Sequence, residues 1–237
     1  MTLSRVKVDR DMGSGRERGA ESAPPVLEVQ DLVVEFRTRR GPLVALEGIS
    51  LEIASGEILG VVGESGAGKS LTGAAVIGLL EPPGVIAGGR ILLNGERIDD
   101  LPYAQMRAVR GKRIGAIFQD PLTSLNPLIP IGEQLVETIR THLPVSEKQA
   151  RERALDLLRE VGIPAPEARL MHYPHQFSGG MRQRVVIALA LCAEPQLIIA
   201  DEPTTALDVS VQAQIISLLK KLCKTREVAV MLVTHDM

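Results

Sequence analysis

Short apolar runs separated by polar, glycine-containing loops occupy most of this chain of 237 residues. Residues 27–36 and 43–53 alternate between apolar and polar side chains, which predicts two half-buried strands. A turn at 37–42 joins them, so the pattern indicates an antiparallel β-layer near the start of the chain. Residues 1–25 show no apolar period and are expected to form a disordered leader.

Fully apolar runs predict buried strands, and apolar residues at helical spacing predict helices around them. The predicted strands are 58–62, 114–118, 197–200 and 228–233, and the predicted helices are 71–80, 131–142, 146–161, 181–192 and 209–222. Strands that alternate with helices indicate an α/β core with a parallel sheet.

Local signals mark the connections. Residues 81–89 are rich in proline and glycine, which predicts a loop. Asn94-Gly95 is a strong signal for a hairpin turn. Ser146 and Gln149 have the spacing of a capping box, so a helix is expected to begin there.

One stretch carries a specific chemistry. Residues 63–70 lie between a predicted strand and a predicted helix, and they have the spacing G-x-x-x-x-G-K-[ST] of a phosphate-binding P-loop. Its glycines let successive N–H groups point at one anion, and the following helix adds the positive end of its dipole. Lys69 is then expected to reach the β- and γ-phosphates, and the Ser70 hydroxyl to ligate Mg²⁺. The candidate nucleotide-binding residues are Gly63, Glu64, Ser65, Gly66, Ala67, Gly68, Lys69 and Ser70.

A magnesium site also needs a carboxylate, and the predicted strand 197–200 leads directly to one. Asp201 lies at the carboxyl end of this strand, which is where open α/β sheets place their ligands. Glu202 follows it and is placed to polarise a water for attack on the γ-phosphate.

Composition narrows the class of protein. Apolar residues make up 45% and charged residues 24%, as in an ordinary soluble globular chain, while only 2% is aromatic, so the core must be aliphatic. A net charge of −2 argues against nucleic acid as a partner. Cys192 and Cys223 lack partners at metal-ligand spacing and are expected to be buried, reduced thiols. No apolar run has the length of a membrane span or of a signal peptide core, so the chain is expected to stay in the cytoplasm.

Residues 177–184 and 201–208 resemble two motifs of the ATP-binding cassette (ABC) ATPases. The first is similar to the signature motif, whose usual form starts Leu-Ser-Gly-Gly-Gln; Phe177 and Met181 replace its outer residues. The second is similar to the Walker B segment and D-loop of the family. Gln119 stands where the family has its Q-loop glutamine, His235 where it has its switch histidine, and Phe36 where an aromatic ring stacks on adenine.

The resemblance implies a fold and a domain organisation. The fold is α/β, a P-loop NTPase core with a mainly parallel sheet, an N-terminal antiparallel β-subdomain and an inserted α-helical subdomain. Residues 26–237 are expected to form the nucleotide-binding domain, with the helical insert at about 120–192.

The resemblance also implies roles for residues. Glu202 would act as general base, and His235 would contact the γ-phosphate and the catalytic water. The metal would be organised by Ser70, Gln119 and Asp201. Two cassettes would sandwich the nucleotide, so that ATP on one subunit meets Ser178, Gly179 and Gly180 of the other. Phe36 would contact adenine, although its place on an alternating strand is also typical of a core residue. Arg182 and Arg184 are expected to face solvent or a carboxylate.

Residues 118–127 and 172–181 are similar to those of the oligopeptide, dipeptide and nickel importers. The resemblance therefore implies a second ATPase subunit (identical or different), two membrane permease subunits and an extracytoplasmic solute-binding protein. The chain would lie peripherally on the cytoplasmic face of the cell membrane, with ATP and Mg²⁺ as its cofactors. Peptide is favoured over nickel as the solute.

The sequence keeps two other functions open. An ABC-class ATPase that acts on ribosomes or DNA is disfavoured by the single cassette, the absence of heptads and the net acidity. A non-catalytic half is disfavoured by the presence of Glu202. The sequence ends two residues after His235, where relatives continue, so a truncated and inactive fragment is the remaining alternative.

Overall fold

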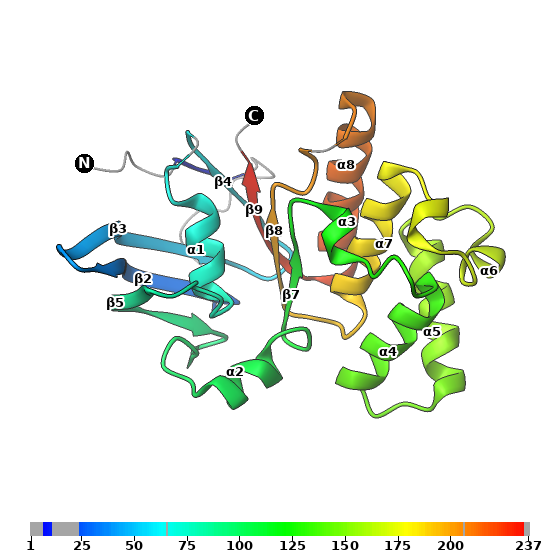
Figure 1. The fold of residues 1–237 in the computed structure, drawn as a ribbon, viewed down its shortest axis with the longest axis horizontal. Helices are drawn as coiled ribbons and strands as arrows, with labels where there is room; N and C mark the ends of the chain where they lie inside the picture. Colours follow the sequence, from blue (N-terminus) through cyan, green and yellow to red (C-terminus); the bar gives the residue numbers. More distant parts are fainter. Residues whose placement is uncertain (1–6, 11–23, 65, 206, 235–237) are drawn as a thin grey trace. The chain divides into compact units, whose positions relative to one another are not determined.

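A computed structural model describes residues 7–10, 24–64, 66–205 and 207–234. The chain forms two compact units (Figure 1). The first comprises residues 1–110 and 223–237, and the second comprises residues 111–222. The predicted helical insert, 120–192, lies within the second unit.

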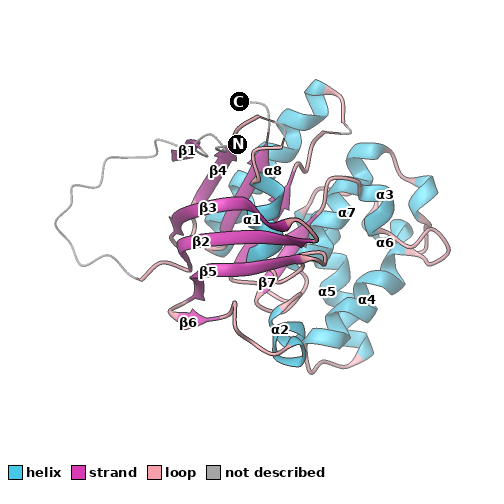
Figure 2. Ribbon diagram, turned by 60° about the vertical axis from the view of Figure 1, so that its left-hand side comes forward, coloured by secondary structure: helices cyan, strands magenta, loops and turns pink. Residues whose placement is uncertain are grey.

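The first unit contains an antiparallel sheet with the strand order β3-β2-β5-β6, whose long strands lie side by side in Figure 2. Its strands are β2 (Leu27–Thr38), β3 (Gly41–Ile53), β5 (Gly84–Leu93) and β6 (Glu96–Arg97). The alternation expected for β2 is present, since Leu27, Val29, Leu32 and Val34 are buried. These side chains give the sheet an aliphatic inner face, and the predicted antiparallel layer is confirmed.

The loop predicted at 81–89 is wrong for residues 84–89, which belong to β5 and pair with β2. The glycines in this stretch permit a bulge instead of ending a strand. Gly89 has φ +81°, and a Cβ there would lie 2.4 Å from the carbonyl oxygen of Asp31, whose own φ is +46°. The hairpin turn at Asn94-Gly95 is confirmed, with φ values of +50° and +77°.

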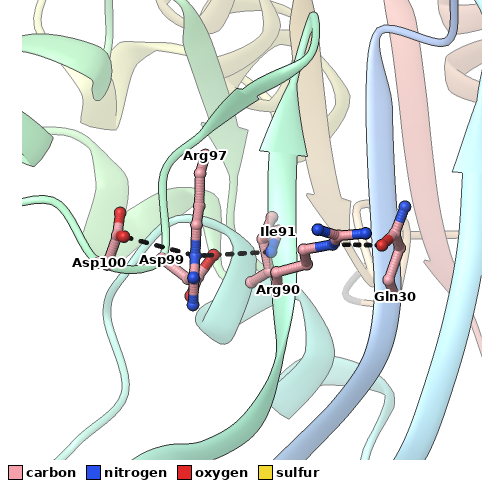
Figure 3. Close-up of polar contacts among 6 residues, drawn as sticks. All are labelled: Gln30, Arg90, Ile91, Arg97, Asp99 and Asp100. Carbon is pink, nitrogen blue, oxygen red and sulfur yellow. Dashed lines mark hydrogen bonds and ion pairs between the residues drawn. The ribbon is translucent and has the colours of Figure 1, made fainter.

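Asp99 fastens the segment after this hairpin to β5 (Figure 3). Its carboxylate accepts the backbone N–H of Ile91 at 2.7 Å and Arg97 Nη2 at 2.8 Å, and its side chain is only 4% exposed. Burial opposes ionisation of Asp99, but the hydrogen bonds from Arg97 and Ile91 outweigh it and hold the pKa of this carboxyl below its usual value. On the neighbouring strand, Gln30 accepts a hydrogen bond from Arg90.

The first unit also contains the strands that lead to the P-loop. Strand β4 (Ile58–Val62) pairs in parallel with β9 (Ala229–Thr234) and antiparallel with β1 (Lys7–Arg10). The helices of this unit are α1 (Lys69–Val76) and α2 (Tyr103–Val109). Strand β1 lies within the predicted disordered leader and was missed, because backbone pairing at a sheet edge needs no apolar period. Residues 1–6 and 11–23 of that leader lie outside the described residues.

The second unit combines a parallel strand pair with helices (Figure 1). The strands are β7 (Ile114–Ile117) and β8 (Leu197–Asp201). The helical elements are α3 (Pro121–Ser124), α4 (Ile131–His142), α5 (Glu147–Glu160), α6 (Pro166–Arg169), η1 (Pro174–Gln176), α7 (Gly179–Leu191) and α8 (Val209–Arg226), of which α8 extends past the boundary of the unit. The predicted capping box of Ser146 and Gln149 begins α5 and is confirmed. No helix within the described residues is long and apolar enough to cross a membrane.

Both cysteines are buried, as expected. Burial raises the pKa of the Cys192 and Cys223 thiols to about 11, so both remain protonated at neutral pH.

Candidate nucleotide site

The P-loop lies in the first unit, between β4 and α1. Strand β4 is paired up to Val62, which lies opposite Thr234 at the end of β9. Helix α1 begins at Lys69, with Gly68 as its N-cap in the left-handed conformation. The strand, glycine turn and helix expected from the sequence are therefore present. The backbone N–H groups in the first turn of α1 point toward the P-loop.

Lys69 is held against the loop backbone. Its ammonium donates hydrogen bonds to the carbonyl oxygens of Gly63 at 2.7 Å and Glu64 at 2.8 Å, and the residue is only 5% exposed. Both of these partners are neutral backbone carbonyls, so neither of them cancels the positive charge of the ammonium. It is suited to attract a phosphate.

Two glycines of the loop are required by its conformation. Gly66 and Gly68 both have φ +81°, where a side chain costs about 1–2 kcal/mol. A Cβ at Gly68 would also lie 2.3 Å from Cδ2 of Leu46, which is fully buried. Ser65, a predicted binding residue of the same loop, lies outside the described residues.

The second unit contains the predicted acidic element. Strands β7 and β8 run parallel, and Ile117 lies opposite Ala200. Gln119 and Glu202 each follow two residues later, so the register brings them to the same edge of the sheet. Gln119 Nε2 donates to Glu202 Oε2 at 3.0 Å. Asp201 closes β8, as predicted.

Glu202 has a second partner that the sequence interpretation missed. Thr205 Oγ1 donates to the same carboxylate oxygen at 3.1 Å. Glu202 itself has φ +48°, an unusual backbone conformation for a residue with a side chain, and such conformations gather at functional sites. Gln212, also missed, donates from α8 to two backbone carbonyls of the loop after Glu202. The resemblance to Walker B and the D-loop covers residues 201–208 and gives no role to Thr205, and Gln212 lies beyond it.

The signature segment begins α7. Ser178 is the N-cap of this helix, and its hydroxyl accepts the backbone N–H of Met181 at 3.3 Å. Phe177, which replaces the usual leucine, is buried, and the Arg169 guanidinium lies 5.5 Å from the centre of its ring. Phe177 therefore acts as an anchor for the start of α7.

The two signature glycines leave room for neighbouring side chains of the same unit. A Cβ on Gly180 would lie 2.6 Å from Cγ1 of Val211, and a Cβ on Gly179 would lie 3.3 Å from Cδ2 of Leu207. The signature segment thus packs against the loop that follows Glu202 and against the start of α8.

Arg182 and Arg184, which were expected to face solvent or a carboxylate, are half-buried, and their guanidinium groups bond to backbone carbonyls. Arg182 Nε donates to the carbonyls of Pro174 and Phe177 at 3.1 and 3.0 Å, and Arg184 Nη1 donates to the carbonyl of Val161 at 2.6 Å. Backbone carbonyls at the ends of helices lack intrahelical donors, and guanidinium groups supply them here.

The predicted metal ligands have the chemistry that Mg²⁺ prefers. Ser70 offers a hydroxyl, Gln119 an amide oxygen and Asp201 a carboxylate, which are all hard oxygen donors. Within the described residues, no three His, Cys, Asp or Glu side chains gather to hold a metal by themselves. A few oxygen ligands complemented by phosphates are typical of Mg²⁺ with a nucleotide, so the residues fit this ion.

The predicted roles of Phe36 and His235 are not tested by the structure. Phe36 is half-buried on β2, and a Cβ on Gly84 would lie 3.1 Å from its ring. Contact of Phe36 with adenine therefore stays a prediction. His235 lies outside the described residues, directly after β9.

A P-loop together with an acidic strand end and a signature segment defines the class of the ATP-binding cassettes. Residues 46–205, more than half of the chain, match the family model described as "ABC transporter". The chain belongs to the ABC transporter family.

Two similar proteins have names that refer to peptide transport. The chain is 50% identical over 213 residues to the oligopeptide transport ATP-binding protein OppD of Bacillus subtilis. The aligned region covers 90% of this chain and 60% of that protein. It is 46% identical over 212 residues to the dipeptide transport ATP-binding protein DppD of Escherichia coli, covering 90% of this chain and 65% of that protein. The chain therefore spans less than two thirds of the length of these relatives.

Solved cassettes share the fold. A dimeric structure of the ATP-binding cassette MJ0796, bound to ADP and Pi, matches with a TM-score of 0.76 and 30% identity over 89% of this chain and 88% of that one. The cbiO1 protein of Clostridium perfringens matches with a TM-score of 0.75 and 29% identity over 90% of this chain and 79% of that one. The predicted α/β cassette fold is confirmed.

Proposed function

We propose that this chain is the ATP-hydrolysing subunit of an ABC importer that takes up peptides. The contact between Gln119 and Glu202 carries the proposal. It presents a carboxylate and an amide together at the carboxyl edge of parallel strands, which is where sheets of this kind bind ligands. The similarity to OppD and DppD supports peptide as the solute, with nickel as the alternative.

The proposed binding of ATP involves two copies of the cassette. Lys69 and the N–H groups of the P-loop hold the phosphates, while Phe36 stacks on adenine. Ser178, Gly179 and Gly180 contact the γ-phosphate of ATP that is held by a second cassette. The working unit is then a dimer of identical or different ATPase subunits, which the dimeric state of MJ0796 supports by analogy.

Hydrolysis needs a base and an ordered water. Glu202 accepts the proton of the attacking water, and His235 contacts the γ-phosphate. Ser70, Gln119 and Asp201 would hold Mg²⁺, which neutralises charge that develops on the phosphates. Gln119 donates its Nε2 hydrogen to Glu202, so its Oε1 is the atom available for the metal.

The proposed assembly couples hydrolysis to transport. Two cassettes close on ATP and reopen after hydrolysis beneath two membrane permease subunits, to which an extracytoplasmic protein delivers the solute. The chain would lie peripherally on the cytoplasmic face of the cell membrane, and nucleic acid would not be a partner.

The catalytic part is tested by ATP binding and hydrolysis with Mg²⁺ in the 237-residue chain and its Glu202→Gln variant. The variant is expected to bind ATP like the parent and to hydrolyse it about 10²- to 10⁴-fold more slowly, because the base is lost. Equal rates would refute the role of Glu202. Failure of both proteins to bind ATP would refute a nucleotide site altogether.

The transport part needs an experiment in the cells that produce this protein. Replacing Glu202 by Gln in the chromosome is expected to abolish uptake of a radiolabelled dipeptide or oligopeptide and to leave uptake of radioactive nickel unchanged. Loss of nickel uptake with normal peptide uptake would assign the importer to the metal. Normal uptake of both would refute the importer function.

A further inference from the structure

Gln212 lies in the first turns of α8 and covers the loop that follows Glu202. Side chains of a helix lean toward its N-terminus, so a long polar residue at this position reaches back over the preceding loop. Its amide nitrogen, Nε2, donates to the carbonyl oxygen of Thr204 at 3.1 Å and to that of Leu207 at 3.0 Å. Both hydrogens of one amide group are thus used on the same loop.

The loop between these two carbonyls presents Thr205 to Glu202. The Thr205 hydroxyl donates to Glu202 Oε2 at 3.1 Å, and the Thr205 N–H donates to the Glu202 carbonyl at 3.3 Å. The Leu207 N–H donates in turn to the Thr204 carbonyl at 3.0 Å. Loss of the hydrogen bonds to the carbonyls of Thr204 and Leu207 therefore makes the turn that orients the Thr205 hydroxyl more mobile.

The same loop also lies against the signature glycines. Leu207 Cδ2 lies 3.3 Å from where a Cβ on Gly179 would stand, and Cγ1 of Val211, next to Gln212, lies 2.6 Å from where a Cβ on Gly180 would stand. A displacement of the loop would disturb this packing as well. Gln212 is thus placed where one side chain restrains both the carboxylate of Glu202 and the start of α7.

We propose that Gln212 is a positioning residue, which braces the loop after Glu202 and so keeps the Glu202 carboxylate in its productive orientation. This inference rests on the proposed function for its effect on hydrolysis, but not for the brace itself. Gln212 touches neither the reacting atoms nor the phosphates in this assignment. It acts through Thr204, Leu207 and Thr205.

The brace is tested first without nucleotide, by amide hydrogen exchange. Gln212→Met keeps the length of the side chain and removes both N–H donors. We expect amide exchange at Thr205 and Leu207 to become about tenfold faster, since two hydrogen bonds that restrain the loop are lost. Gln214→Met is the matched control, because Gln214 is exposed on the same helix and its contact is with Arg184, at 3.3 Å. Unchanged exchange in Gln212→Met, or equal acceleration in both variants, would overturn the proposal.

The positioning effect is tested by steady-state hydrolysis of ATP. Gln212→Met is expected to lower kcat about 10- to 100-fold and to change KM by no more than about threefold, because an orienting contact is lost and binding groups are kept. A normal kcat in a variant with faster exchange would show that the brace does not position Glu202, and would overturn that part. If the parent chain itself fails to hydrolyse ATP, the proposed function fails, and hydrogen exchange still decides the brace.

Discussion

Gln119 and Glu202 form a hydrogen bond of 3.0 Å across two neighbouring parallel strands. Ile117 and Ala200 form the last pair of residues between these strands, and Gln119 and Glu202 each lie two positions further along. The strand register, which buried apolar side chains determine, therefore sets the distance between the amide and the carboxylate. The geometry of the candidate catalytic pair is thus a consequence of the core of the second unit.

Replacing Gln119 tests this pairing directly. Gln119→Glu places two carboxylates about 3 Å apart, and like charges at that distance repel strongly. We expect Gln119→Glu to reduce ATP hydrolysis more than Gln119→Ala, which removes the orienting amide and costs about 10- to 100-fold. Steady-state rates of the two variants at neutral pH make the comparison. Equal rates would show that the amide does not face Glu202 during the reaction.

The sequence predicts the residues of this site better than it predicts their contacts. The spacing of residues 63–70 specifies a P-loop, because few other structures need glycines and lysine in that order. Gln119 and Glu202 are recognisable from their motifs and strand ends. The hydrogen bonds of Gln212 cannot be recognised from the sequence, because a polar residue in the first turns of a surface helix has no distinguishing pattern.

In the fold, too, some elements are predictable from the sequence and others are not. The strand 58–62 and the helix 131–142 occur as predicted, because the first is a short apolar run and the second has apolar residues at helical spacing. For part of strand β5 the sequence predicts a loop, since its glycines and the prolines before it are typical of turns. The bulge opposite Asp31 depends on pairing with a distant strand, which local sequence does not reveal.

The P-loop glycines allow a prediction about stability. Gly66→Ala meets open space but must adopt φ +81°, so we expect a loss of about 1–2 kcal/mol in the free energy of unfolding. Gly68→Ala adopts the same φ and also collides with Leu46, which is buried and has little room to move, so its loss is expected to reach about 3 kcal/mol or more. Urea unfolding of both variants measures the difference. A smaller loss for Gly68→Ala would mean that Leu46 repacks freely.

The signature segment offers a test of packing that is independent of ATP. Gly180→Ala is expected to lower the free energy of unfolding by about 1–3 kcal/mol, because the new Cβ would lie 2.6 Å from Val211. In a Val211→Ala background the same substitution is expected to cost much less, since the obstructing methyl group is gone. The double-mutant cycle, measured by urea unfolding, isolates this contact. Additive losses would show that Gly180 and Val211 do not interact.

The ionised carboxylate of Asp99 gives the first unit a stability that depends on pH. The pKa of Asp99 is lower in the folded chain than in the unfolded chain, because Arg97 and the Ile91 amide bond to the charged form. Its stabilisation is therefore complete above the unfolded pKa, about 4, and is lost as the pH falls through the lower folded value. Asp99→Asn is expected to lower the free energy of unfolding by about 1–2 kcal/mol at pH 7, a modest value because Arg97 is half-exposed.

The difference between Asp99→Asn and the parent is expected to shrink as the pH falls below about 4, where the parent carboxyl also becomes neutral. Asp100→Asn is the matched control. Asp100 lies 3.4 Å from the same guanidinium, but its side chain is exposed, so its loss should change stability little. Urea unfolding of the three proteins at several pH values makes the measurement. A difference for Asp99→Asn that stays constant with pH would mean that the shape of the side chain, and not its charge, fastens this segment to β5.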